Sequence, residues 1–152
     1  MAAHRLHGAG DMNPQAETLK ARTKKFALDV LAFIDTFGQR GAATTTIGQQ
    51  LSDAATAVAA NYRATCRARS DAEFAAKIGG VLEEADESSF WLELAHARQM
   101  GSPDQRHRLL DEANQLTAIF VSSTITARER VERNRAERRR SRNRHSPVRP
   151  PI

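Results

Sequence analysis

Apolar residues recur at intervals of three and four along this chain, and that spacing limits the fold more than any other feature of the sequence. Such a spacing places side chains along one face of an α-helix, whereas a half-buried strand requires strict alternation. No stretch of the chain alternates in that way. The first periodic stretch begins near Pro14, and its apolar face consists of Leu19, Phe26, Val30, Phe33 and Phe37.

Three further stretches have the same spacing and predict three further helices. The second stretch, from Thr44, has an apolar face rich in alanine, which allows a neighbouring helix to approach closely. In the third, apolar residues spread over a broad arc that includes Phe90, Trp91 and Leu94, and this favours burial on more than one side. The apolar face of the fourth stretch consists of Leu109, Ala113, Leu116, Phe120 and Ile125. After Val131 the apolar spacing ends and most residues are charged.

Residues that start and stop helices separate the four stretches. Glycine readily adopts the left-handed conformation that ends a helix, and we expect helix ends at Gly38, Gly41 and Gly101. Helix starts are predicted at Pro14, at the capping boxes Thr46–Gln49 and Ser70–Glu73, and at Ser102–Pro103. Four helices joined by short turns must alternate in direction. The sequence therefore predicts an all-α protein, an antiparallel up-down-up-down four-helix bundle.

The distribution of charge divides the chain into parts. Residues 133–152 contain eight arginines and one glutamate, so this tail carries +7, and the residues before it carry 5 − 7 = −2 of the chain's net charge of +5. We expect a flexible N-terminal arm over residues 1–13, the four-helix bundle over 14–132, and a disordered Arg/Pro-rich tail over 133–152. Any attraction to nucleic acid is then a property of the tail.

The chain has a single cysteine, Cys66, and so cannot form an internal disulfide. No stretch approaches the roughly 18 apolar residues that a membrane helix needs. We therefore expect a cytoplasmic location and no membrane partner.

Several runs of residues in the second and third predicted helices are distinctive. They are Ala60-Asn61-Tyr62-Arg63, Cys66-Arg67-Ala68-Arg69-Ser70, Ala72-Glu73-Phe74, Glu84-Ala85-Asp86-Glu87 and Phe90-Trp91-Leu92-Glu93-Leu94. With Met12-Asn13-Pro14 and Ile119-Phe120-Val121, they closely resemble the bacterial four-helix bundle protein family, which is related to 23S rRNA intervening-sequence proteins. The resemblance covers residues 12–130. It implies a bundle that assembles into a ring-like homo-oligomer, with a pentamer favoured.

Most members of that family have no assigned activity, so the resemblance implies a fold more than a function. Distant relatives resemble the accessory variability proteins of retroelements, basic rings that engage a reverse transcriptase and its RNA. The chain departs from the family at Gln49 and Asp53, which stand where many members carry arginine. Losing those charges weakens binding of RNA by the bundle surface, since such binding scales with the number of neutralised phosphates.

Arginines near the end of the second helix precede an acidic group in the third. Arg63 and Arg67 come before Glu84 and Glu87, and Asn61 lies in the same run as the arginines. Groups of this kind form either a catalytic pocket or an inter-helix network that fixes the register of two helices. We interpret the five residues as a structural polar network.

The residue patterns of known catalytic and metal sites are incomplete in this sequence. Glu93 and His96 have the spacing found in di-iron bundles, but such sites need a second Glu-x-x-His pair, and the chain has none. Cys66 lacks a histidine and an acid that would activate it as a nucleophile, and we expect it to be a small buried hydrophobe. We therefore expect no enzymatic activity, cofactor, metal or small-molecule substrate. The aromatic residues are interpreted as core or oligomer contacts rather than as base-stacking platforms: Tyr62, Phe90 and Trp91.

The arginine-rich tail is the feature that fits a partner. We hypothesise an oligomeric scaffold that binds RNA, or an RNA-handling protein, through a group of closely spaced arginines: Arg138, Arg139, Arg140, Arg142 and Arg144. The alternative is a structural or protein-interaction module that does not bind nucleic acid, with a solvated tail. In a ring, several tails would lie close together and raise the local charge and the avidity.

Overall fold

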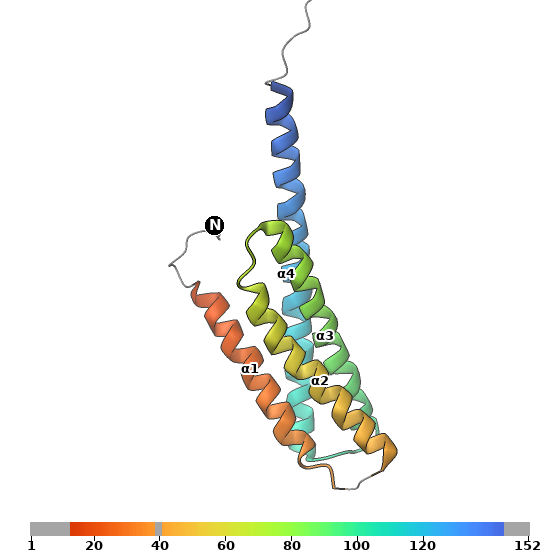
Figure 1. The fold of residues 1–152 in the computed structure, drawn as a ribbon. Helices are drawn as coiled ribbons and strands as arrows, with labels where there is room; N and C mark the ends of the chain where they lie inside the picture. Colours follow the sequence, from red (N-terminus) through yellow and green to blue (C-terminus); the bar gives the residue numbers. More distant parts are fainter. Residues whose placement is uncertain (1–12, 39–40, 145–152) are drawn as a thin grey trace, which may run out of the picture.

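The computed structural model describes residues 13–38 and 41–144, which form four α-helices and no strand (Figure 1). The prediction of an all-α protein with four helices is confirmed. The helices are α1 (Pro14–Ile34), α2 (Ala42–Thr65), α3 (Asp71–Ala97) and α4 (Pro103–Arg144). In Figure 1 the α1–α2 and α3–α4 connections lie at one end of the bundle, and the α2–α3 turn lies at the other. None of these helices is both long and apolar enough to cross a membrane.

The core lies between the apolar faces of the four helices. Most of its large side chains are those that the spacing predicts, and each is fully buried: Phe26, Val30, Phe33, Leu51, Val58, Ile78, Leu92, Leu116 and Phe120. Ile125 is an exception, because it is 53% exposed and the buried position belongs to Thr124. Thr124 is four residues after Phe120, which keeps it on the buried face of α4, whereas Ile125 turns a further 100° towards solvent.

Several predicted helix boundaries are confirmed by their capping contacts. The side chain of Asn13 accepts a hydrogen bond from the backbone N–H of Gln15 at 3.0 Å, and Pro14 occupies the first turn of α1. At the start of α3, Ser70 accepts a hydrogen bond from the N–H of Glu73 at 3.0 Å. These side chains satisfy backbone donors that the first turn of a helix leaves unpaired.

Gly101 closes the turn between α3 and α4 in a conformation that other residues adopt poorly. Its φ is +63°, and a Cβ there would lie 2.6 Å from Cε2 of Phe33 and 2.7 Å from Oγ1 of Thr36. The glycine is required both by the backbone conformation and by the close approach of the end of α1.

Three boundaries differ from the sequence predictions. The second helix begins at Ala42, with Gly41 as a cap that makes no side-chain hydrogen bond, so Thr46 lies inside the helix. The first helix ends at Ile34, before the glycine expected to stop it. The fourth continues to Arg144, so residues 133–144 are helical rather than disordered. Residues 1–12 and 145–152, which belong to the predicted terminal segments, lie outside the described residues.

The extra length of α4 has a physical cause in its composition. Seven of the twelve helical residues beyond Glu132 are arginine, which is a strong helix former, as are the alanine and the glutamate among the other five. Arg135 also pairs with Glu132 one turn earlier, at 2.9 Å. Glu–Arg pairs in the sequence allow the first part of this run to extend the fourth helix, and a coil is predicted only after Arg138. The helix nevertheless continues to Arg144, because a helix that has already begun in the bundle is not limited by nucleation.

Candidate nucleic-acid interface

The last part of α4 projects beyond the bundle as a basic helix. Residues 135–144, here termed the extension, contain six arginines and one glutamate, and every one of these residues is exposed. In Figure 1 the blue end of α4 continues past the α2–α3 turn without another helix beside it. At 1.5 Å per residue, ten residues of helix carry these charges over about 15 Å.

The helical period places the arginines of α4 on two opposite sides. Arg135, Arg139 and Arg142 share one side with Arg138, and together they line a shallow concave surface. Arg133, Arg140 and Arg144 are spaced seven and four apart and lie on the opposite side. A helix with cations on both sides can neutralise two rows of phosphates at once.

The base of the extension is fixed to the start of α3 by Asp71. Nδ2 of Asn134 donates a hydrogen bond to Oδ2 of Asp71 at 2.7 Å, and a guanidinium nitrogen of Arg130 lies 3.6 Å from Oδ1. Asp71 occupies the first turn of α3, where a negative charge also interacts favourably with the helix dipole. These contacts determine the position at which α4 leaves the bundle.

The structure does not bring the five residues of the predicted polar network together. Arg63 and Arg67 lie at the end of α2 and in the turn after it, whereas Glu84 and Glu87 lie in the middle of α3. Within residues 13–38 and 41–144, neither arginine forms an ion pair with either glutamate. Helices that turn back on each other pair residues at equal distances from the turn, and Glu84 lies much further from the turn than Arg63.

The surroundings of the two glutamates agree with this placement. Burial raises the pKa of Glu84, and the neighbouring charges of Glu87, Glu83 and Asp53 raise it further. Its closest charged neighbours are therefore acidic. Glu87 accepts a hydrogen bond from Nε1 of Trp91 at 3.2 Å along the same helix. Asn61 is exposed on α2, and its backbone carbonyl accepts a hydrogen bond from Thr65 at 2.8 Å.

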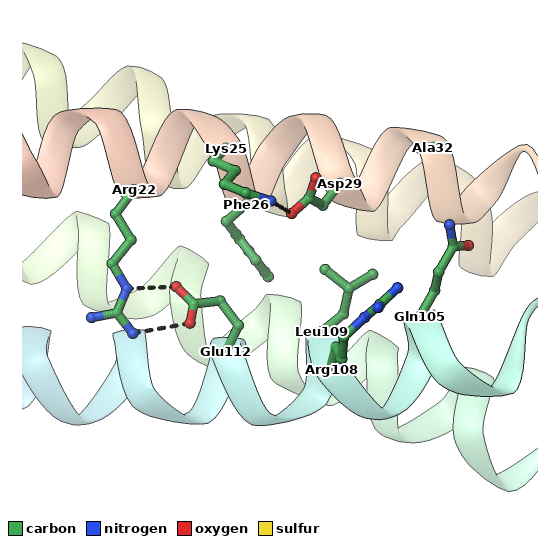
Figure 2. A pocket seen from close by; sticks show the side chains of 9 residues that line it. All are labelled: Arg22, Lys25, Phe26, Asp29, Ala32, Gln105, Arg108, Leu109 and Glu112. Atoms are coloured by element: carbon green, nitrogen blue, oxygen red, sulfur yellow. Dashed lines mark hydrogen bonds and ion pairs between the residues drawn. The ribbon is translucent and has the colours of Figure 1, made fainter.

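A second concave surface lies between α1 and α4 and encloses a pocket with a volume of about 600 Å³ (Figure 2). Arg22 of α1 faces Glu112 of α4 and forms a bidentate pair with it, at 2.6 and 2.9 Å. The hydrogen bond that Arg22 donates to Glu112 is the main cause of the raised pKa of Arg22. Lys25 pairs with Asp29 on the same wall. The Arg22–Glu112 pair links α1 to α4, and because each of the two pairs is neutral, they offer little net attraction to a charged ligand.

The residues considered for catalysis or metal binding are not arranged as a reactive site. No group of three or more His, Cys, Asp or Glu side chains able to hold a metal ion occurs in the described part of the chain. Nδ1 of His96 accepts a hydrogen bond from Nε of Arg106 at 3.3 Å. Burial raises the pKa of the Cys66 thiol, which keeps it protonated and weakly nucleophilic at neutral pH.

The fold and the surface together define a small helical-bundle protein with a basic helical extension. The sequence profile of the family described as 23S rRNA-intervening sequence protein matches residues 18–122, and the chain belongs to this family. This finding confirms the resemblance seen in the second and third helices. The extension lies outside the matched residues, so membership of the family does not account for it.

A solved structure has the same fold. It is the crystal structure of a protein with unknown function from the S23 ribosomal protein family of Bacteroides thetaiotaomicron VPI-5482. The two structures align with a TM-score of 0.63 and 20% sequence identity, over 72% of this chain and 97% of the other. No curated protein matches the chain.

Proposed function

We propose that this protein is a non-enzymatic, oligomeric helical scaffold that binds RNA through the extension of α4. One observation carries the proposal, the exposed helix with arginines on two opposite sides. Arginine is suited to phosphate because its planar guanidinium donates paired hydrogen bonds to the phosphate oxygens. The association of the family with 23S rRNA intervening sequences gives a reason to test RNA before other polyanions.

The charges of the extension also favour a polyanionic partner on energetic grounds. Arg135 and Arg139, Arg138 and Arg142, and Arg140 and Arg144 are like-charged pairs one helical turn apart. Each such pair destabilises an isolated helix by about 0.2–0.5 kcal/mol. Phosphates bound along both sides would remove this repulsion, so binding and helix formation would support each other.

Assembly into a ring-like homo-oligomer, with a pentamer favoured, belongs to the same proposal. Large apolar side chains on α3 and α4 support it, because Phe90 is 49% exposed, Val121 42% and Ile125 53%. Apolar groups that remain exposed on a folded chain are typical of a surface that contacts another protein. An oligomer would present several extensions together and strengthen weak individual contacts with one RNA.

The same apolar side chains support a second candidate function, a protein-interaction module that does not bind nucleic acid. In that case Phe90, Val121 and Ile125 would contact a different protein rather than another copy of the chain. The extension would then be a solvated helix without a partner. The two candidates differ in whether removal of the extension changes binding.

Binding of labelled single-stranded RNA separates these candidates. We expect the full chain to bind the RNA at low salt and to lose affinity steadily as the potassium chloride concentration rises, because each neutralised phosphate releases counterions. The variant with Arg138, Arg139 and Arg142 each changed to Gln keeps the helix but should bind much more weakly. Equal binding by the two proteins would contradict the role of the extension. Equal affinity for duplex DNA would show general polyanion binding instead of a preference for RNA.

A further inference from the structure

The α2–α3 turn lies beside the point at which α4 leaves the bundle. Asp71, the first residue of α3, contacts both Asn134 and Arg130 of α4, at 2.7 and 3.6 Å. Arg67 precedes Asp71 by four residues, and so short a segment spans at most about 14 Å even when fully extended. The surface of the turn and the extension are therefore neighbours, as Figure 1 also shows.

The two acidic side chains in the first turn of α3 already have partners. Asp71 is engaged by α4, as described above. Glu73 accepts a hydrogen bond from the backbone N–H of Arg69 at 2.8 Å and pairs with Lys77 at 2.9 Å. These contacts lower the pKa of Glu73 to about 2, and the backbone hydrogen bond contributes most. Both carboxylates are thus neutralised by groups other than Arg63 and Arg67.

Arg63 and Arg67 are therefore exposed cations at the end of the bundle from which the extension leaves. Neither forms an ion pair with an acidic side chain among residues 13–38 and 41–144. Arg63 lies in the last turn of α2, where its charge also interacts favourably with the carbonyl end of the helix. The partners of Arg63 in that interaction are backbone carbonyls, and its guanidinium group remains accessible to a ligand.

We propose that Arg63 and Arg67 contact RNA phosphates, so that bound RNA crosses the α2–α3 turn before it follows the extension. This inference rests on the proposed function and adds a second group of contacts to it. The turn and the extension lie at the same end of the bundle, and the two acids in the first turn of α3, Asp71 and Glu73, are already paired. The sequence grouped these two arginines with Glu84 and Glu87, but those glutamates lie too far along α3 to neutralise them.

The test measures how RNA affinity depends on salt in a double variant, Arg63→Gln with Arg67→Gln. For a single strand, each lost phosphate contact lowers the slope of log affinity against log salt by about 0.7. We expect the double variant to lose about 1.4 in slope relative to the full wild-type chain. Its unfolding transition should shift only slightly, since both side chains are exposed and only the interaction of Arg63 with the end of α2 is lost.

A matched control carries the same loss of charge at the other end of the bundle. Arg98 and Arg108 are exposed residues near the α3–α4 turn, and the variant Arg98→Gln with Arg108→Gln should keep the wild-type slope. An equal fall in slope for both variants would mean that only net charge matters, and it would overturn the inference. An unchanged slope in the Arg63/Arg67 variant would overturn it as well, while leaving the proposed function intact. Absence of RNA binding by the wild-type chain would instead refute the proposed function.

Discussion

Arg106 is buried at the α3–α4 turn and is only 6% exposed, although arginine is usually a surface residue. One guanidinium nitrogen donates a hydrogen bond to the carbonyl of Met100 at 2.7 Å, and Nε donates to His96 at 3.3 Å. The first contact satisfies a carbonyl near the end of α3 that has no partner inside the helix. Arg106 therefore has a structural role in this turn.

Replacement of Arg106 by alanine should destabilise the fold, because the Met100 carbonyl would lose its partner and a cavity would remain. We expect a loss of about 2 kcal/mol in the free energy of unfolding. The exposed Arg108 provides the control, and Arg108→Ala should change it by less than about 0.5 kcal/mol. Urea unfolding at one fixed protein concentration measures both values. Equal stabilities of the two variants would show that the contacts of Arg106 with Met100 and His96 contribute nothing to the free energy of unfolding.

At this scale, the sequence predicts side chains that follow the helical period and fails where a contact joins distant segments. The burial of Phe26 and Phe120 follows from spacing alone. The capping contact between Ser70 and Glu73 is local, and a short motif is enough to predict it. Neither the burial of Arg106 nor the link from Asp71 to α4 has such a local signal, since both depend on how the helices pack.

At the scale of whole elements, the length of α4 is the main difference between expectation and structure. The hydrophobic pattern ends at Val131, and for this reason the sequence predicts that the bundle ends at residue 132. The pattern reports which residues are buried, whereas helix propensity and continuation from an existing helix decide where α4 stops. For the residues after Arg138 the sequence therefore predicts a coil, whereas the structure has a projecting helix.

The extension should behave as a unit that unfolds independently of the bundle. Ala136 is exposed in the extension, whereas Ala127, on the same helix, is 6% exposed in the core. Glycine in place of alanine weakens a helix by about 1 kcal/mol. We expect Ala127→Gly to lower the free energy of unfolding of the bundle by at least that amount, and Ala136→Gly to leave it unchanged.

Far-UV circular dichroism during urea unfolding, with hydrogen exchange of the extension's amides, distinguishes these variants. Ala136→Gly should speed exchange within residues 135–144 alone, because those residues make no core contacts. If both glycine variants shift the main transition equally, the extension unfolds together with the bundle. The helical binding surface would then be preformed rather than stabilised by its ligand.

At the scale of the whole molecule, the bundle buries one continuous core and leaves large apolar side chains outside it. Val121 and Ile125 lie one turn apart on α4, and Phe90 projects from α3. α3 and α4 are side by side, since Oγ of Ser89 lies 3.4 Å from Oγ1 of Thr117, one turn before Val121. The fold follows from the four helical patterns and the family from the residue runs of the second and third helices, but a surface that would join copies has no comparable pattern in the sequence.

The proposed oligomer makes a direct prediction about mass. The chain has a mass of 16.8 kDa, and light scattering at micromolar concentration should give a multiple of this value. Placing aspartate at Val121 and Ile125 should yield a helical monomer, because association would then bury two unpaired charges. Leu28 on α1 is 56% exposed, and Leu28→Asp is the matched control that should leave the mass unchanged. If only the Leu28→Asp control dissociates, the interface between copies lies on α1 instead. A monomeric wild-type chain would refute the oligomer, and a single extension would then bind RNA without avidity.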